Sequence, residues 1–126
     1  MLTVACVLAG LAALLHVYIF WLEALAFDTA GRKAFQVSAE HAAVMKPWAY
    51  NQGFYNLFLA IGTAVGIALM GSNRDAGVAL VVLGVGSMLA AAVVLITSDP
   101  SKARGALVQG TVPALALLSL AIWAWT

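Results

Sequence analysis

The amino-acid sequence predicts an all-α integral membrane protein, built as an antiparallel bundle of four transmembrane helices with a short cytoplasmic helix between the first and the second. Of the 126 residues, 64% are hydrophobic and only 9% are charged, and the mean hydropathy is +1.02. A soluble domain carries about 25% charged residues. Four apolar runs are each long enough to cross a bilayer, which needs about 20 residues. We expect one domain that covers residues 1–126.

The apolar runs predict spans at residues 2–27, 47–70, 76–97 and 105–125. Pro47 suits the first position of the second helix, because a proline there loses no hydrogen bond within the helix. Short polar segments separate the later spans, and short connections require neighbouring helices to run antiparallel. Open β structure is excluded in lipid because its backbone groups would lack hydrogen-bond partners.

The connection between the first two spans is the longest and covers residues 28–46. Ser38 is a favourable residue for the start of a helix, because its hydroxyl can accept a hydrogen bond from a free backbone N–H. We therefore expect a short helix from Ala39 to about Lys46, lying near the surface of the bilayer.

Basic residues are distributed unevenly between the two predicted faces of the bundle. The face with the first and third connections contains five basic residues: Arg32, Lys33, Lys46, Lys102 and Arg104. The opposite face, with the second connection, contains only Arg74. Cytoplasmic loops of membrane proteins carry the excess of Lys and Arg. We expect a multi-pass protein of the cell membrane with loops one and three in the cytoplasm and both termini outside.

Two ionisable residues, His16 and Glu23, lie within the first apolar run. They are seven residues apart, about two helical turns, and therefore share one face of a helix. Such groups are costly to place in lipid and usually face the protein interior or a wet cavity. They are the first candidates for ligand binding or for acid–base catalysis.

A group of polar side chains begins the second span, and helical spacing predicts that they form one stripe. Each amide needs a hydrogen-bond partner in lipid, so we expect this stripe to face the bundle or a cavity. Gln109 adds an amide near the start of the fourth span. The sequence thus predicts one polar, ligand-binding pocket in the cytoplasmic half, formed by His16, Glu23, Asn51, Gln52, Tyr55, Asn56 and Gln109. The alternative is that these groups only bond one another and fix the register of the helices.

Other kinds of site find no support in the sequence. The histidines and carboxylates show no metal-binding spacing such as HExxH, so we expect no metal and no cofactor. The net charge of +1 provides no basic surface for nucleic acid. Cys6 is the only cysteine, so no disulfide forms within the chain. Gly62 and Gly66 form a GxxxG pattern, which packs helices either within one chain or between the chains of a homo-oligomer.

Several short motifs, taken together, resemble a known family. The motifs are His16-Val17-Tyr18-Ile19-Phe20 with Leu22-Glu23, Asn51-Gln52-Gly53-Phe54-Tyr55-Asn56 with Phe58-Leu59-Ala60, and Gln109-Gly110 with Pro113-Ala114. The chain resembles the small bacterial four-helix membrane proteins called domain of unknown function 1304, which implies the bacterial inner membrane. Phe27 stands where this family often has Trp, and Leu57 where it often has Gly. The resemblance implies a shared fold and pocket but no particular activity.

Three functions fit these observations. The first is binding or transport of a small molecule, with proton coupling through Glu23 and His16. A four-helix chain is too thin to hold a channel alone, so transport favours a homo-oligomer. The second is a membrane-embedded enzyme for a lipophilic substrate, with His16 or Glu23 as the general acid or base. The third is a structural accessory subunit whose polar groups only join the helices.

Overall fold

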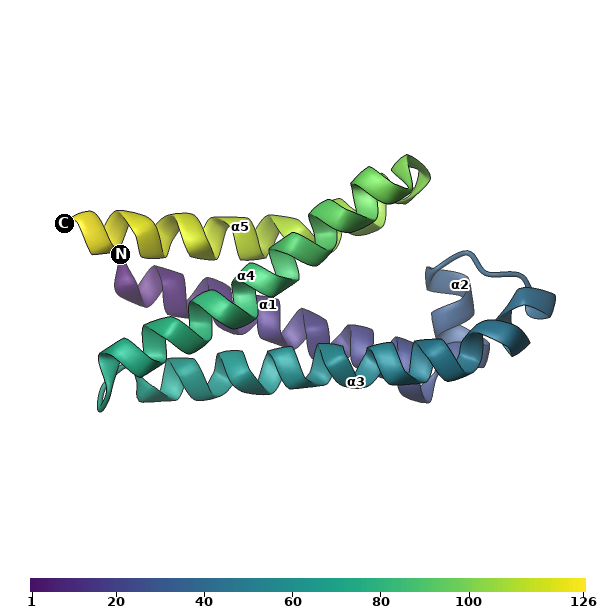
Figure 1. Ribbon diagram of the computed structural model, residues 1–126, viewed down its shortest axis with the longest axis horizontal. Coiled ribbons are helices and arrows are strands. Elements are labelled where there is room, and N and C mark those ends of the chain that lie inside the picture. The colour runs from purple at the N-terminus through teal and green to yellow at the C-terminus, as the bar shows by residue number, and fades with distance from the viewer.

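The computed structural model describes all 126 residues and contains helices but no strands (Figure 1). Four helices are long and apolar enough to cross a membrane, so the chain is a multi-pass membrane protein and the predicted all-α class is confirmed. Residues Trp21–Leu25 and Phe27–Gly31 are π-helical, and Pro100–Lys102 form a 3-10 helix. In chain order the elements are α1 (Leu2–Phe20), η1 (Trp21–Leu25), η2 (Phe27–Gly31), α2 (Arg32–Ala34), α3 (Ala39–Leu69), α4 (Arg74–Ser98), η3 (Pro100–Lys102) and α5 (Ala103–Trp125).

The four long helices form a ring, in which α1 packs against α3 and α5, and α4 packs against the same two helices. In Figure 1 each long helix runs back along the long axis relative to the one before it, and the two chain termini lie together at the left. We call this side the terminal end of the bundle. The opposite side, which carries α2 and η3, is the α2 end.

An apolar core fills the terminal half of the bundle. Small residues let the helix backbones approach closely there. Gly66 of α3 lies directly against α4, because a Cβ atom on it would be 2.9 Å from the carbonyl oxygen of Gly77. Gly62, the other glycine of the GxxxG pattern, has no neighbour within 4 Å of such a Cβ atom. The core consists of Ala5, Ala9, Met70, Val81, Val85, Ala116 and Leu120.

Helix α3 differs from the predicted helix that begins at Pro47. Ser38 caps its start as expected, since the His41 backbone N–H donates to Ser38 Oγ at 3.3 Å. The helix then continues through Pro47 to Leu69, so the prediction of a separate cytoplasmic helix was wrong. An interior proline removes one backbone hydrogen bond, and Pro47 is exposed on the surface of the bundle. With 31 residues, α3 is about 46 Å long, which exceeds the apolar thickness of a bilayer.

Candidate functional site

A hydrogen bond between Glu23 and Asn56 joins η1 to α3. The amide Nδ2 of Asn56 donates to Glu23 Oε2 at 2.8 Å, and the Glu23 side chain is half-buried. The same Nδ2 also lies 3.3 Å from the carbonyl oxygen of Gln52. Gly53 brings the two segments together, because a Cβ atom on it would lie 3.0 Å from the Cβ of Ala24. A glycine contact thus positions the only acidic side chain of the first span against a neutral amide.

Aromatic rings flank the same contact between the first span and α3. The rings of Phe20 and Phe54 meet edge to face, with centroids 5.2 Å apart. Tyr50 and Phe58 extend this group along α3, with centroids 5.1 Å and 6.2 Å from that of Phe54. Such aromatic pairs add stability beyond the apolar area that they bury. The Glu23–Asn56 hydrogen bond is therefore formed between segments that are already held by apolar contacts.

His16 is almost completely buried, with 2% of its surface exposed. Its Nδ1 lies 2.9 Å from the carbonyl oxygen of Ala12. A carbonyl can only accept, so Nδ1 donates, and in the neutral ring the proton is on Nδ1. Nε2 of the neutral ring then carries the lone pair. Because a helix rises about 1.5 Å per residue, the seven-residue separation places His16 roughly 10 Å from Glu23 along the helix axis.

Gln109 lies on the face of α5 that turns toward the core. It is half-buried and belongs to the row that continues through Pro113, Ala116 and Leu120. Ala116 and Leu120 pack in the same core cluster as Ala5 of α1. The amide of Gln109 therefore continues the core-facing row of α5 toward the α2 end, the half of the bundle that contains Glu23.

The expected polar stripe on α3 does not turn inward as a whole. Asn56 is half-buried and contacts Glu23, whereas Asn51, Gln52 and Tyr55 are exposed. These four residues span roughly 140° around a helix, at about 100° per residue. An arc of that width is too broad for one contact with a neighbouring helix, so only its edge reaches the bundle interior.

Two of the grooves in the structure are apolar, and neither of these coincides with the expected polar pocket. One, of about 520 Å³, lies between α1 and α3 and is lined by residues such as Val7, Leu14 and Ile67. The other, of about 240 Å³, lies between α4 and α5 beside Leu89 and Leu107. No group of three or more His, Cys, Asp or Glu side chains is placed to hold a metal ion. The site residues expected from the sequence provide one carboxylate, one imidazole, one phenol and four neutral amides.

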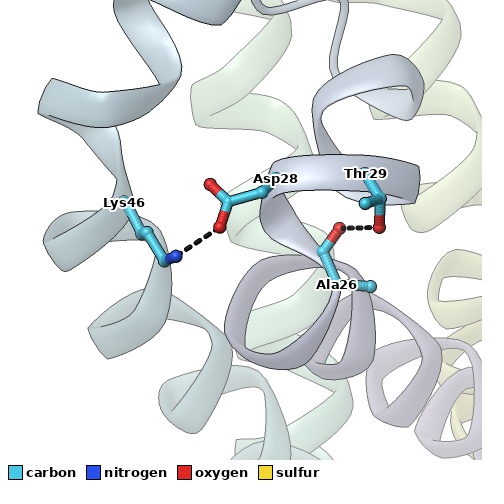
Figure 2. Close-up of polar contacts among 4 residues, drawn as sticks. All are labelled: Ala26, Asp28, Thr29 and Lys46. Atoms are coloured by element: carbon cyan, nitrogen blue, oxygen red, sulfur yellow. Dashed lines mark hydrogen bonds and ion pairs between the residues drawn. The ribbon is translucent and has the colours of Figure 1, made fainter.

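Several contacts that shape the α2 end involve groups that were not among the site residues expected from the sequence. Figure 2 shows the ion pair that Lys46 of α3 forms with Asp28 of η2. It also shows the hydroxyl of Thr29 donating to the carbonyl oxygen of Ala26 at 3.3 Å. Lys102 Nζ donates to the carbonyl oxygen of Phe35 at 3.3 Å and so ties the α4–α5 connection to the segment after α2. The Lys46–Asp28 and Lys102–Phe35 pairings join residues that are distant in the sequence, and no local pattern indicates them.

Gly31 makes the close turn between η1 and η2 possible. A Cβ atom on Gly31 would lie 2.1 Å from the carbonyl oxygen of Leu22, far inside a normal contact. The two π-helical turns end in matching hydrogen bonds, from the Ala26 N–H to Trp21 O at 2.9 Å and from the Gly31 N–H to Ala26 O at 2.8 Å. π-helical turns are rare in proteins, and those that do occur often lie at functional sites. Here they contain Glu23 and follow directly from α1.

A family model described as Protein of unknown function (DUF1304) matches residues 10–121, which is most of the chain. The chain belongs to this family. Searches of curated proteins and of solved structures find no match to it.

Proposed function

We propose that this member of the DUF1304 family binds a small molecule at the α2 end and transports it. Binding and transport are coupled to the uptake and release of a proton by Glu23 and His16. The observation that carries the proposal is the Glu23–Asn56 hydrogen bond. It holds a carboxylate inside a membrane span with a neutral amide as its only hydrogen-bond partner. Ionisable residues in such positions mark ion and substrate pathways in membrane proteins.

His16 provides a second position for a proton on the same helix. Its donated hydrogen bond to Ala12 leaves Nε2 free to accept a proton. Glu23 and His16 are separated by about two turns of α1 and η1. Two proton-accepting groups spaced along the direction of a membrane span are what a proton relay needs.

Sidedness and assembly are part of the proposal. The positive-inside rule places the α2 end in the cytoplasm, because five of the six Lys and Arg residues lie there. A ring of four helices with a dry terminal core leaves no continuous path through one chain. Transport therefore requires a homo-oligomer, in which Gly62 is free to contact a second copy.

A membrane-embedded enzyme is the second candidate, and the free Nε2 of His16 favours it, since a general base needs an available lone pair. Movement of protons separates the two functions. Vesicles that contain the protein and a trapped pH-sensitive dye report proton flux across the membrane. If the protein is a proton-coupled transporter, adding substrate changes the dye signal. If it is an enzyme, it converts the substrate without net proton movement across the membrane.

The first experiment is native mass spectrometry of the protein released from nanodiscs. We expect a homo-oligomer with a discrete bound molecule. Asn56→Leu should lose this molecule, whereas Asn51→Leu, which changes an exposed amide on the same helix, should retain it. A bare monomer, or the same bound mass in both variants, would contradict the proposal and favour a structural accessory subunit.

A further inference from the structure

The Glu23 carboxylate has no cation beside it. Its hydrogen-bond partner is the amide of Asn56, and the only ion pair of the molecule joins Lys46 to Asp28. All the lysines and arginines lie toward the two ends of the bundle. Charges within a membrane span are almost always paired or open to a wet cavity. The position beside Glu23 is therefore suited to a cation that is not part of the chain.

Helix α4 separates from α3 toward the α2 end, as Figure 1 shows. The row of α4 that faces α3 begins with Gly77 and Gly84, which are buried. The same row continues at intervals of seven residues through Ala91 and Ser98, and both of these are exposed. The contact between the two helices thus ends between Gly84 and Ala91.

The facing row of α3 changes in the same way. Thr63 is fully buried at its contact with α4, whereas Tyr55 and Gln52, two and three turns further along, are exposed. Both lie beside Asn56, whose amide donates to the carbonyl of Gln52 as well as to Glu23. The polar face of α3 that α4 leaves uncovered therefore lies beside the residue that contacts the half-buried carboxylate.

We propose that the ligand of this site is a lipophilic organic cation, which enters from the bilayer between α3 and α4 and pairs with the Glu23 carboxylate. This inference rests on the proposed function and names its substrate class. A molecule that is already dissolved in lipid could reach this level of α3, because α4 leaves Tyr55 and Gln52 exposed there. The carboxylate selects positive charge, and the exposed ring of Tyr55 offers a π face to the same cation.

The chemistry of the site favours an organic cation over an inorganic one. Ca²⁺ takes six to eight oxygen ligands, and Mg²⁺ demands near-octahedral geometry. One carboxylate, that of Glu23, lies beside Asn56, and no group of three or more His, Cys, Asp or Glu side chains is placed to hold a metal ion. A delocalised or alkylated cation needs only one counter-charge and an apolar surface.

A proton competes with the cation for Glu23, because no other charged group occupies the site. On α1 the titratable group that shares a face with Glu23 is His16, about two turns away, and Tyr18 lies on a different face. On η2, Asp28 is paired with Lys46, and on α3 the neighbouring titratable side chain is the tyrosine at position 55. α4 and α5 carry no titratable side chain between Asp75 and Asp99 or beyond Arg104. Binding of a cation should therefore release the proton held by Glu23.

The test uses two probes of one shape and opposite charge, tetraphenylphosphonium and tetraphenylborate, titrated by calorimetry into the full-length protein in nanodiscs. We expect the cation to bind, and Glu23→Gln to weaken its binding roughly tenfold or more, which corresponds to about 1.4 kcal/mol. The control Glu40→Gln changes an exposed carboxylate on α3 and should bind as the unmodified protein does. Circular dichroism verifies that each variant is folded.

Each outcome has a distinct meaning. Equal binding of both probes, unaffected by Glu23→Gln, would overturn the inference, because it describes partition into lipid. A molecule that is retained in mass spectra and lost in Asn56→Leu, together with no binding of the cation, would overturn the cation class and leave the proposed function standing. Titrations in buffers of different ionisation enthalpy count released protons. Cation binding without proton release from about pH 5 to about pH 8 would support the class and contradict proton coupling.

Discussion

The terminal half of the bundle is packed through glycine and alanine, whereas the α2 half is joined by polar side chains and two π-helical turns. In the terminal half, the backbones of α3 and α4 touch at Gly66 and Gly77. In the α2 half, the same two helices separate and leave Tyr55 exposed. The comparison shows why polar groups gather at one end: close packing of small residues leaves no room for them, and separated helices give them both room and access.

The largest effect is expected where backbones touch. A Cβ atom at Gly66 would lie 2.9 Å from both the Gly77 carbonyl oxygen and the Val81 nitrogen, and neither backbone atom can move alone. We expect Gly66→Ala to lower the free energy of unfolding by about 1–3 kcal/mol, the usual cost of overpacking. Thermal unfolding in detergent, followed by circular dichroism, measures it.

Gly62→Ala is the matched control on the same helix. No atom lies within 4 Å of a Cβ atom at that position, and both substitutions gain the same helix propensity of up to about 1 kcal/mol. Gly62→Ala should therefore leave the midpoint of unfolding unchanged or raise it. Equal midpoints for the two variants would show that the terminal half tolerates extra volume, and the contrast between the halves would fail.

A second glycine separates local from global effects. Gly31→Ala would place a Cβ atom 2.1 Å from the Leu22 carbonyl oxygen, so the η1–η2 turn must rearrange. The terminal core contains no residue of this turn. We expect loss of the bound molecule in native mass spectra with a smaller change in unfolding midpoint than Gly66→Ala causes. Gly105→Ala, also toward the α2 end but without a neighbour within 4 Å, should retain the molecule.

The Glu23–Asn56 bond has a smaller expected effect on stability. Polar bonds between membrane helices contribute on average about 0.6 kcal/mol and at most about 1.7 kcal/mol. Asn56→Leu should destabilise the protein by an amount in this range, and the same change in a Glu23→Leu background should cost nothing further. Unfolding midpoints of the four proteins of this double-mutant cycle provide the coupling. Additive effects would mean that the two side chains act independently.

The sequence predicts the spans well because lipid requires long apolar helices, and that requirement is local. The start of α3 was predicted wrongly for a different reason. Proline prefers the first position of a helix, and inside a helix it costs about 3 kcal/mol through a lost hydrogen bond and a clash with the carbonyl four residues earlier. The α3 helix nevertheless continues through Pro47. The π-helical turns depend on Gly31 approaching Leu22 across nine residues, a contact that no periodicity indicates.

For the candidate site, the sequence identifies the residues more easily than their directions. His16 and Glu23 stand out because each interrupts an apolar run. Asn56 and its neighbours also stand out, but a stripe of polar residues on a helix does not reveal which edge meets the bundle. That choice depends on Gly53, which fixes how η1 approaches α3.

The smallest expected effect on stability comes from the polar side chains that accept backbone hydrogen bonds in the connections at the two ends of the bundle. At the terminal end, Asn73 Oδ1 accepts from the Ala76 backbone N–H at 3.2 Å. At the α2 end, Asp99 Oδ1 accepts from the hydroxyl of Ser101 at 2.6 Å and from its backbone N–H at 3.0 Å. The hydrogen bond from the Ser101 side chain, followed by that from its backbone, holds the pKa of Asp99 below its usual value of 3.8.

A depressed pKa in the folded state means that the Asp99 cap stabilises the protein above pH 3.8, and that this contribution is lost as the pH falls through the lowered pKa. Asp99→Asn should therefore be slightly less stable than the unmodified protein near neutral pH, and the difference should disappear in acid. Asn73 does not titrate, so the cost of Asn73→Ala should stay constant over the same range. Unfolding midpoints from pH 7 to about pH 3 test both statements. A difference for Asp99→Asn that persists in acid would mean that the α4–α5 connection depends on the shape of this side chain and not on its charge.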